Sequence, residues 1–148
     1  MGVFPCGRLD IDTTGLLLMT NDGAAAHALL SPKRHVDKTY RFVCDPPIGE
    51  DARRQLETGV DIGDCVTMPA IVAPEGKEPF TRGEITLREG KFHQIKRMFC
   101  TCGSEIVSLE RIRFGALTLD PGLPRGGWRA LTEDEESRLL SDIPRREK

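Results

Sequence analysis

Residues 7–23, with the sequence GRLDIDTTGLLLMTNDG, constrain the fold of this chain more than any other stretch. The segment has three parts: a glycine-bounded turn that carries Arg8 and two aspartates, the apolar run LLLM, and a polar turn. Four consecutive apolar residues between turn signals fit a strand that is buried on both faces. The segment therefore predicts that Asp10 lies in a loop anchored by a core strand, where a rigid scaffold can hold a reactive group.

Asp10 has two explanations at this point. An arginine two positions away can keep a nearby carboxylate ionised, which suits a reactive acid. Asp10 and Asp12 are also typical of an ordinary turn, because Asp and Gly favour turns for local reasons. The pattern alone favours the ordinary turn, since short motifs of this kind often match by chance.

Length and composition describe one ordinary globular domain. A chain of 148 residues, 39% hydrophobic and 30% charged, can bury a core and is neither disordered nor fibrous. Its apolar runs are all far shorter than the ~20 residues that a helix needs to cross a bilayer, so no membrane partner is expected. The five cysteines fit neither a disulfide framework nor a zinc site, which predicts reduced thiols, a cytoplasmic location and no bound metal.

The distribution of charge is more informative than the net charge of −2. Basic residues gather at 33–41 and 88–97, with Arg111 and Arg113 as a smaller third group. Acidic residues concentrate at 45–64 and 133–136. This pattern fits either a basic face that attracts phosphate or a mixed, solvated surface.

Periodicity and turn signals predict short strands and four helices. Helices are expected at residues 22–31, 50–58, 93–102 and 132–141. Strands are expected at residues 38–44, 60–72 (as two or three pieces), 82–88, 106–109 and 113–119, with turns at 45–49 and 74–79. Trp128 is expected to begin one more strand and to pack its ring on the core. Because helices and strands do not alternate as βα units, the fold class is α+β with a mixed, mainly antiparallel sheet flanked by a few helices.

The helix expected from His93 has a clear apolar stripe. The stripe consists of Ile95, Met98, Phe99 and Cys102, at spacings of three and four residues. Gln94, Lys96 and Arg97 lie near the helix start, off that stripe. A helix N-terminus with nearby cations is a natural place for a phosphate, and a solvated amphipathic helix gives the same pattern.

Three motifs, in this order, resemble the pseudouridine synthases of the RsuA branch, which modify ribosomal RNA. They are GRLDIDTTGLLLMTNDG at residues 7–23, KTY at 38–40 and EGKFHQIKRMF at 89–99; the later LTEDEE at 131–136 also has the look of the family. The resemblance implies a pseudouridine synthase catalytic domain over residues 1–142, followed by a polar tail at 143–148.

The resemblance also implies an activity, the isomerisation of a uridine in ribosomal RNA, of the small subunit (16S), to pseudouridine. The N-glycosidic bond breaks, the base turns, and it rejoins the sugar through carbon, so no redox cofactor or metal is expected. The base must leave its stack, because its reacting atoms are otherwise covered. Whether a carboxylate attacks the base ring or the sugar carbon stays open.

Site residues follow from the same motifs. Asp10 is the expected nucleophile, Tyr40 is expected to stack on the flipped uracil and to assist proton transfer, and Lys96 is expected to pair with Asp10 and hold it ionised. Further RNA contacts are expected from Arg8, Thr13, Lys38, Gln94 and Arg97. Asp12 is expected to be structural, because the reactive acid of the family directly follows Arg-Leu.

The start of the chain departs from the family. Family members usually carry an RNA-binding domain like ribosomal protein S4 and then a Lys-Pro-x-Gly strand ahead of the GRLD loop, whereas six residues precede Gly7 here. A fragment, a mis-assigned start codon and a natural short form compete as explanations. A missing strand leaves a sheet edge uncovered, which predicts self-association through that edge or weaker RNA binding. The alternative function is therefore an RNA-binding module without turnover.

Overall fold

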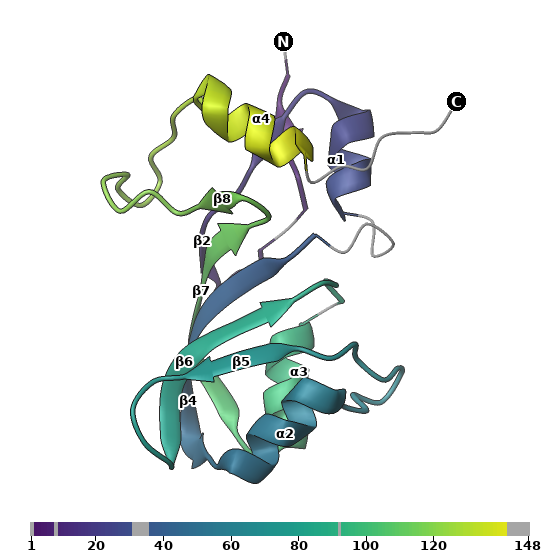
Figure 1. Ribbon diagram of the computed structural model, residues 1–148, viewed down its shortest axis with the longest axis vertical. Coiled ribbons are helices and arrows are strands. Elements are labelled where there is room, and N and C mark those ends of the chain that lie inside the picture. The colour runs from purple at the N-terminus through teal and green to yellow at the C-terminus, as the bar shows by residue number, and fades with distance from the viewer. Residues whose placement is uncertain (1, 8, 31–35, 92, 142–148) are drawn as a thin grey trace.

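The computed structural model describes residues 2–7, 9–30, 36–91 and 93–141, which fold around a central sheet (Figure 1). The strands are β1 (Phe4–Pro5), β2 (Thr14–Gly15), β3 (Met19–Thr20), β4 (Lys38–Ile48), β5 (Ile71–Pro74), β6 (Phe80–Leu87), β7 (Glu105–Phe114) and β8 (Leu117–Thr118). The helices are α1 (Gly23–Leu30), α2 (Glu50–Thr58), α3 (Gln94–Thr101) and α4 (Glu133–Ser141). The expected tail at 143–148 lies outside the described residues.

Strand β4 is the centre of the sheet. It pairs antiparallel with β6 on one side and with β7 on the other, and β5 continues the sheet beyond β6. Strand β2 pairs with β7 in parallel, β8 pairs with β7 antiparallel, and the order of the main path is β2-β7-β4-β6-β5. β1 and β3 form a separate antiparallel pair. The α+β class with a mixed, mainly antiparallel sheet is therefore confirmed.

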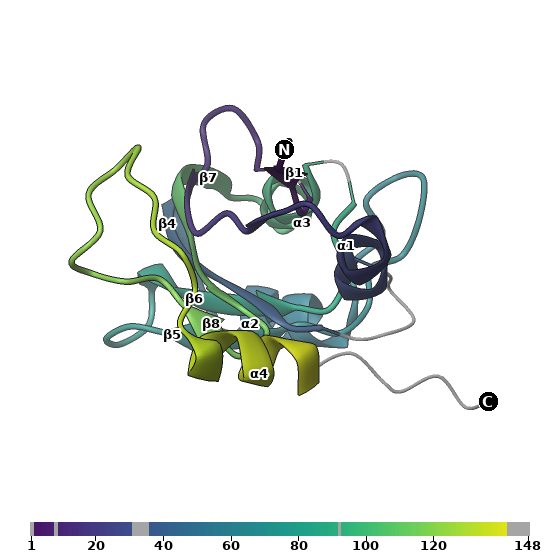
Figure 2. The same ribbon diagram turned by 90° about the horizontal axis from the view of Figure 1, so that it is seen from above.

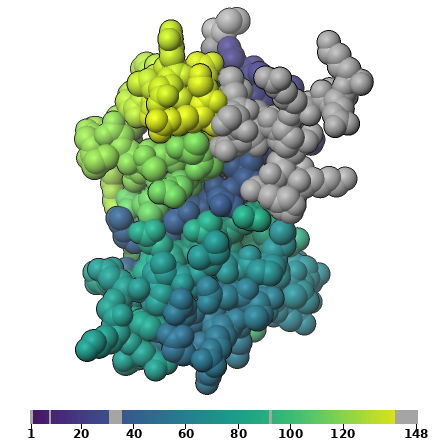
Figure 3. Space-filling view, viewed as in Figure 1, coloured from purple at the N-terminus to yellow at the C-terminus, as the bar shows by residue number. Residues whose placement is uncertain are grey.

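Two apolar cores lie at opposite ends of this sheet. Helices α2 and α3 cover one end (Figure 1), where Phe42 and Phe99 pack with ring centroids 4.9 Å apart. The second core lies near α1 and α4 and includes Leu29, Phe114 and Leu139. Seen from above, the N-terminal segment and α4 lie on opposite sides of the strands (Figure 2). In the space-filling view, α2, β5 and β6 form the lower part of one face and α4 forms the top (Figure 3).

The helix boundaries confirm the expected start and stop signals. The Asp22 carboxylate accepts the backbone N–H of Ala25 at 3.0 Å at the start of α1. Gly59 ends α2 with φ 114°, which glycine adopts readily. Thr132 and Glu135 form a reciprocal capping box at α4, with N···O distances of 2.9 and 3.1 Å. Among the described helices, none is long and apolar enough to cross a membrane.

The expectation that LLLM forms a strand buried on both faces is wrong. Leu18 is buried, whereas Leu17 and Met19 are 38% and 47% exposed. Of its four residues, only Met19 belongs to a strand, β3, which pairs with β1 and not with the central sheet, whereas β2 lies just before the run. It approaches β7 so closely that a Cβ on Gly15, which has φ 111°, would lie 2.2 Å from the Arg111 carbonyl oxygen. Glycine is therefore required where this segment joins the sheet.

Three other expectations need correction. The expected turn at 45–49 belongs mostly to β4, whose pairing with β6 skips from Val43 to Ile48, so an irregularity replaces the turn. The two expected closing strands are mainly one long strand, β7, because its pairing with β4 runs from Glu105 to Phe114, and only the short β8 follows it. Trp128 is 86% exposed and belongs to no strand. Of the strands expected at 60–72, β5 and one bridge between Asp61 and Val66 are present.

Candidate active site

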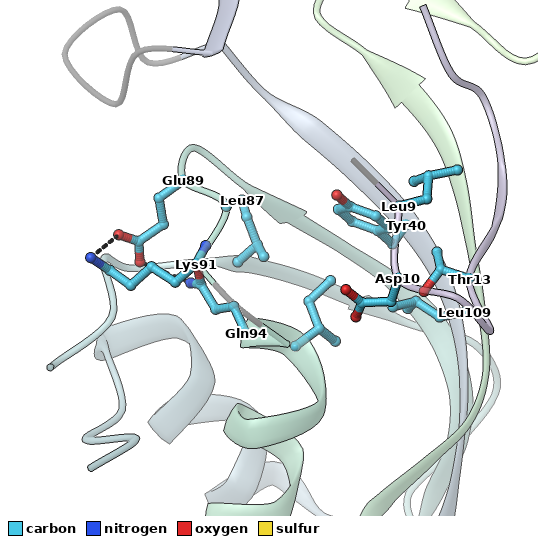
Figure 4. Close-up of a pocket in the computed structure, with 11 residues that line it drawn as sticks. Leu9, Asp10, Thr13, Tyr40, Leu87, Glu89, Lys91, Gln94 and Leu109 are labelled. Carbon is cyan, nitrogen blue, oxygen red and sulfur yellow. Dashed lines mark hydrogen bonds and ion pairs between the residues drawn. The ribbon is translucent and has the colours of Figure 1, made fainter. Parts of the chain in front are cut away.

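A pocket lies where the Asp10 loop meets β4, β7 and the segment that leads into α3 (Figure 4). Of the predicted site residues, it is lined by Asp10, Thr13, Tyr40 and Gln94. Leu87, Ile95 and Leu109 add apolar surface. Figure 4 shows Asp10, Thr13 and Tyr40 at one end of the pocket and Glu89 and Lys91 at the other. The pocket thus combines an acid, an aromatic ring and apolar walls, drawn from segments far apart in the sequence.

Asp10 lies on a turn that is anchored to the sheet. The N–H of Thr13 donates to the carbonyl oxygen of Asp10 at 2.9 Å, which closes a β-turn. Directly after it, β2 pairs with β7, and the N–H of Leu16 donates to the Arg111 carbonyl oxygen at 2.8 Å. The Asp10 side chain remains 30% exposed. A fixed and partly accessible carboxylate is suited to act on a ligand in the pocket.

Lys96, in the first turn of α3, contacts both acids of this turn. Its Nζ lies 3.7 Å from Oδ2 of Asp10 and 2.5 Å from Oδ1 of Asp12. The hydrogen bond from Lys96 holds the pKa of Asp12 below its ordinary value. The structure therefore brings Lys96 to Asp10 as the sequence predicts, although the nearer partner of Lys96 is the acid that was expected to be structural.

Tyr40 lies on the central strand, between Ile85 of β6 and Arg111 of β7. Its side chain is partly buried, packs against the larger core and also lines the pocket. Tyr40 therefore combines contact with the core and access to the pocket, and an aromatic ring is the kind of side chain on which a base can stack.

Gln94 does not point to solvent as its helix position suggested. It is 4% exposed, its Oε1 accepts the N–H of Lys91 at 2.9 Å, and its Nε2 donates to Glu89 at 2.8 Å. Glu89, itself 6% exposed, also accepts the N–H of Met68 at 2.7 Å. Gln94 therefore fixes the 89–91 segment at the far end of the pocket, a connection that the helical period could not reveal.

Lys38 lies outside the pocket lining and is only 5% exposed. Burial, reinforced by the positive charge of Arg111, lowers the pKa of Lys38. Both cations lie near the ring of Phe114, with Lys38 Nζ 5.9 Å and Arg111 Cζ 5.2 Å from its centroid. Arg111 donates from Nε to the carbonyl oxygen of Leu16 at 2.8 Å, which ties β7 to the Asp10 segment.

Arg97, another predicted RNA contact, is not brought to the pocket. Arg97 donates to the Ile62 carbonyl oxygen at 3.0 Å and forms an ion pair with Asp64. Arg8 lies outside the described residues. Other cations of the two basic stretches are also paired with acids from distant segments: Arg41 with Glu110, and Arg88 with Asp37. The described part of these stretches is therefore a mixed surface of ion pairs.

His93 is a neighbour of Asp10 that sequence reasoning did not assign. Its Nε2 lies 3.8 Å from Oδ1 of Asp10. It is the N-cap residue of α3, and its backbone is left-handed, with φ 47° and ψ 37°. The position of His93 within the HQIK motif was the available signal, but the helical pattern gave no reason to turn its ring toward Asp10. Over the described residues, no group of three or more His, Cys, Asp or Glu could hold a metal.

Comparison with known proteins adds independent information. The family model for RNA pseudouridylate synthase matches residues 2–101. The chain is 44% identical over 131 residues to ribosomal small subunit pseudouridine synthase A of Escherichia coli K12, covering 87% of this chain and 55% of that protein. It is 47% identical over 141 residues to the RNA pseudouridine synthase YtzG of Bacillus subtilis, covering 94% of this chain and 59% of that protein.

A comparison of folds also finds similarity to a pseudouridylate synthase. A crystal structure of a pseudouridylate synthase superimposes with a TM-score of 0.85 at 36% identity, over 93% of this chain and 59% of that one. The chain therefore spans between about half and three fifths of the length of each of these three proteins.

Proposed function

This chain belongs to the RNA pseudouridylate synthase family, and we propose that it isomerises a uridine of ribosomal RNA to pseudouridine, with Asp10 as the nucleophile. The observation that carries the proposal is the anchored carboxylate of Asp10, which lines the same pocket as Tyr40 and lies 3.7 Å from Lys96. The similar E. coli enzyme is named for the small ribosomal subunit, which makes 16S RNA the proposed substrate and the cytoplasm the proposed location.

In the proposed reaction, Asp10 acts on a uridine that has left its stack. The ring of Tyr40 stacks on the uracil, and its hydroxyl assists proton transfer. The ammonium of Lys96, 3.7 Å away, faces the Asp10 carboxylate that attacks. Attack at the base ring or at the sugar carbon leads to the same product: the bond to N1 breaks, a bond to C5 forms, and the C5 proton is released while N1 gains one.

The proposed RNA contacts follow the pocket. Thr13 lies beside Asp10, and Lys91 and Gln94 lie at the opposite end. Gln94 and Lys38 are nearly buried and Arg97 is paired with Asp64, so RNA contact by any of these three side chains requires a rearrangement of its present surroundings. Arg8 remains a predicted contact.

The decisive test compares wild type with Asp10→Asn on unmodified 16S RNA carrying uridine labelled with tritium at C5. Wild type is expected to release tritium, and digestion of the RNA should yield pseudouridine at one position. Asp10→Asn should abolish release while the protein keeps its thermal unfolding profile. Asp51→Asn is the matched control, because Asp51 is an exposed acid on α2. Full activity of Asp10→Asn would contradict the assignment.

An RNA-binding module without turnover is the second candidate, since the chain spans only part of its relatives. RNA binding without any pseudouridine in the digested RNA would favour it. The uncovered sheet edge expected from the sequence also predicts that the chain associates with itself or binds RNA more weakly than a longer relative. A sedimentation profile of a monomer, together with RNA affinity equal to that of a longer relative, would contradict that prediction.

A further inference from the structure

We propose that His93 is a positioning residue that holds the carboxylate of Asp10 through its second oxygen, most strongly when the imidazole is protonated. The inference rests on the proposed function of Asp10. It extends that function by naming a group that makes the orientation of the nucleophile depend on pH.

The geometry divides the Asp10 carboxylate between two residues of the same helix start. Nε2 of His93 faces Oδ1 at 3.8 Å, whereas Nζ of Lys96 faces Oδ2 at 3.7 Å. A carboxylate held at one oxygen can still rotate about its side-chain bond, but one held at both oxygens cannot. The two distances exceed those of hydrogen bonds, and such contacts commonly shorten when a substrate is bound.

The backbone of His93 supports a role of this kind. An N-cap residue normally has extended backbone angles and a short polar side chain that accepts a helix N–H. His93 has left-handed angles and makes no such cap hydrogen bond. Among the described residues other than glycine, His93 is the one with a positive φ. Left-handed backbone angles are unfavourable for a residue other than glycine. Such strain is found where a functional site requires a side chain to point in a particular direction.

Among the described residues, two carboxylates and two basic side chains lie together here, so the charge of the imidazole affects how the carboxylates are paired. Asp10 and Asp12 lie on the turn, and Lys96 lies three residues after His93 on α3. When the imidazole is protonated, two carboxylates face two cations, so Lys96 can stay on Asp12 while His93 accompanies Asp10. When the imidazole is neutral, Lys96 is the cation that the two carboxylates share within the described part of the chain. Histidine is the side chain whose charge changes between pH 5 and 8.

The test measures single-turnover pseudouridine formation in wild type and His93→Asn across this pH range. Asparagine tolerates left-handed angles but does not titrate. The rate of His93→Asn should be about 10-fold below that of wild type near pH 5.5. This difference between the two rates should become smaller toward pH 8. His93→Arg, which stays charged, should match wild type near pH 5.5 and should be faster than wild type toward pH 8, where the imidazole of His93 is neutral. His27→Asn, on the exposed face of α1, is the matched control and should match wild type throughout. A ratio for His93→Asn that is constant with pH, or equal to one, overturns the proposal.

Two measurements without RNA separate this inference from the proposed function. The ring resonances of His93 should shift in the NMR spectrum of Asp10→Asn, while those of His27 stay in place. His93→Gly should unfold at no lower a temperature than wild type, because glycine adopts left-handed angles without strain; a purely structural histidine would give a loss. Unchanged His93 resonances overturn the inference. If wild type makes no pseudouridine at any pH, the proposed function fails, and the NMR result still decides the pairing of His93 with Asp10.

Discussion

Lys96 is hydrogen-bonded to Asp12 at 2.5 Å. This pair joins the first turn of α3 to a β-turn 84 residues earlier in the chain. It also places the ammonium close to Asp10, 3.7 Å away. Asp12 thereby fixes the cation that accompanies the proposed nucleophile, so the second acid of the motif has a definite structural role.

This arrangement predicts different effects for the loss of Lys96 and the loss of Asp12. Lys96→Met leaves two neighbouring carboxylates without their shared cation, so the single-turnover rate should fall by about 100-fold. Asp12→Asn leaves the contact between Lys96 and Asp10 available, and the rate should stay within about 10-fold of wild type. Tritium release from labelled RNA measures both. Lys77→Met, an exposed lysine of the β5–β6 loop, is the control. A larger loss in Asp12→Asn than in Lys96→Met would show that Asp12 has more than a structural role.

Tyr40 offers a way to separate stacking from proton transfer. Tyr40→Phe keeps the ring and removes the hydroxyl, so RNA affinity should hold while the single-turnover rate falls by about 100-fold, the usual size of a general acid–base contribution. Tyr40→Leu removes the flat ring and should also weaken binding, by about 1–3 kcal/mol. Filter binding and tritium release provide the two readings. Equal RNA affinity in Tyr40→Leu and wild type would exclude a stacking role.

The sequence predicts the architecture best where the signals are local. Apolar spacing places α3, and Gly59 and the Thr132–Glu135 pair set helix boundaries, because each depends on residues within a few positions. LLLM was misjudged because apolar runs do not show where a strand lies in a sheet. The close approach of Gly15 to β7, which sets that location, involves residues almost a hundred positions apart.

In the candidate site, too, the sequence predicts what depends on local motifs and misses what depends on contacts between distant segments. The motifs indicate Asp10, Tyr40 and Lys96 as a group, and the structure brings Lys96 to Asp10 and places Tyr40 at the same pocket. Gln94 and Lys38 could not be judged from the sequence, because their burial depends on Glu89 and on the packing beside Arg111. The positions of charged residues along the sequence likewise do not show which of them form ion pairs between distant segments.

Gln94 should matter for stability as well as for the shape of the pocket. Gln94→Leu removes one of the two hydrogen bonds to Oε1 of Glu89, which is 6% exposed, and the loss of a hydrogen bond to a charged group costs about 1.5–3 kcal/mol. Urea unfolding should show this loss in the free energy of unfolding. Glu89→Gln in the same background should recover part of it, because the buried charge is gone. Additive losses in the double variant would mean that the two side chains are not coupled.

The last prediction concerns Glu135, whose carboxylate receives both terminal nitrogens of Arg129 at 2.7 and 2.8 Å. The hydrogen bonds from Arg129, and then the one from the Thr132 backbone, lower the pKa of Glu135 from 4.5 to about 2. A carboxylate whose pKa is lower in the folded state stabilises the fold above its unfolded pKa, and this contribution is lost as the pH falls through the folded value.

Glu135→Gln should therefore be less stable than wild type at neutral pH. The difference should shrink as the pH falls from 4.5 to about 2. Urea unfolding at several pH values measures it, and Glu136→Gln, one residue on and exposed, should show no such trend. A difference that persists at the acidic end would mean that Glu135 stabilises α4 through packing or its neutral cap and not through its charge.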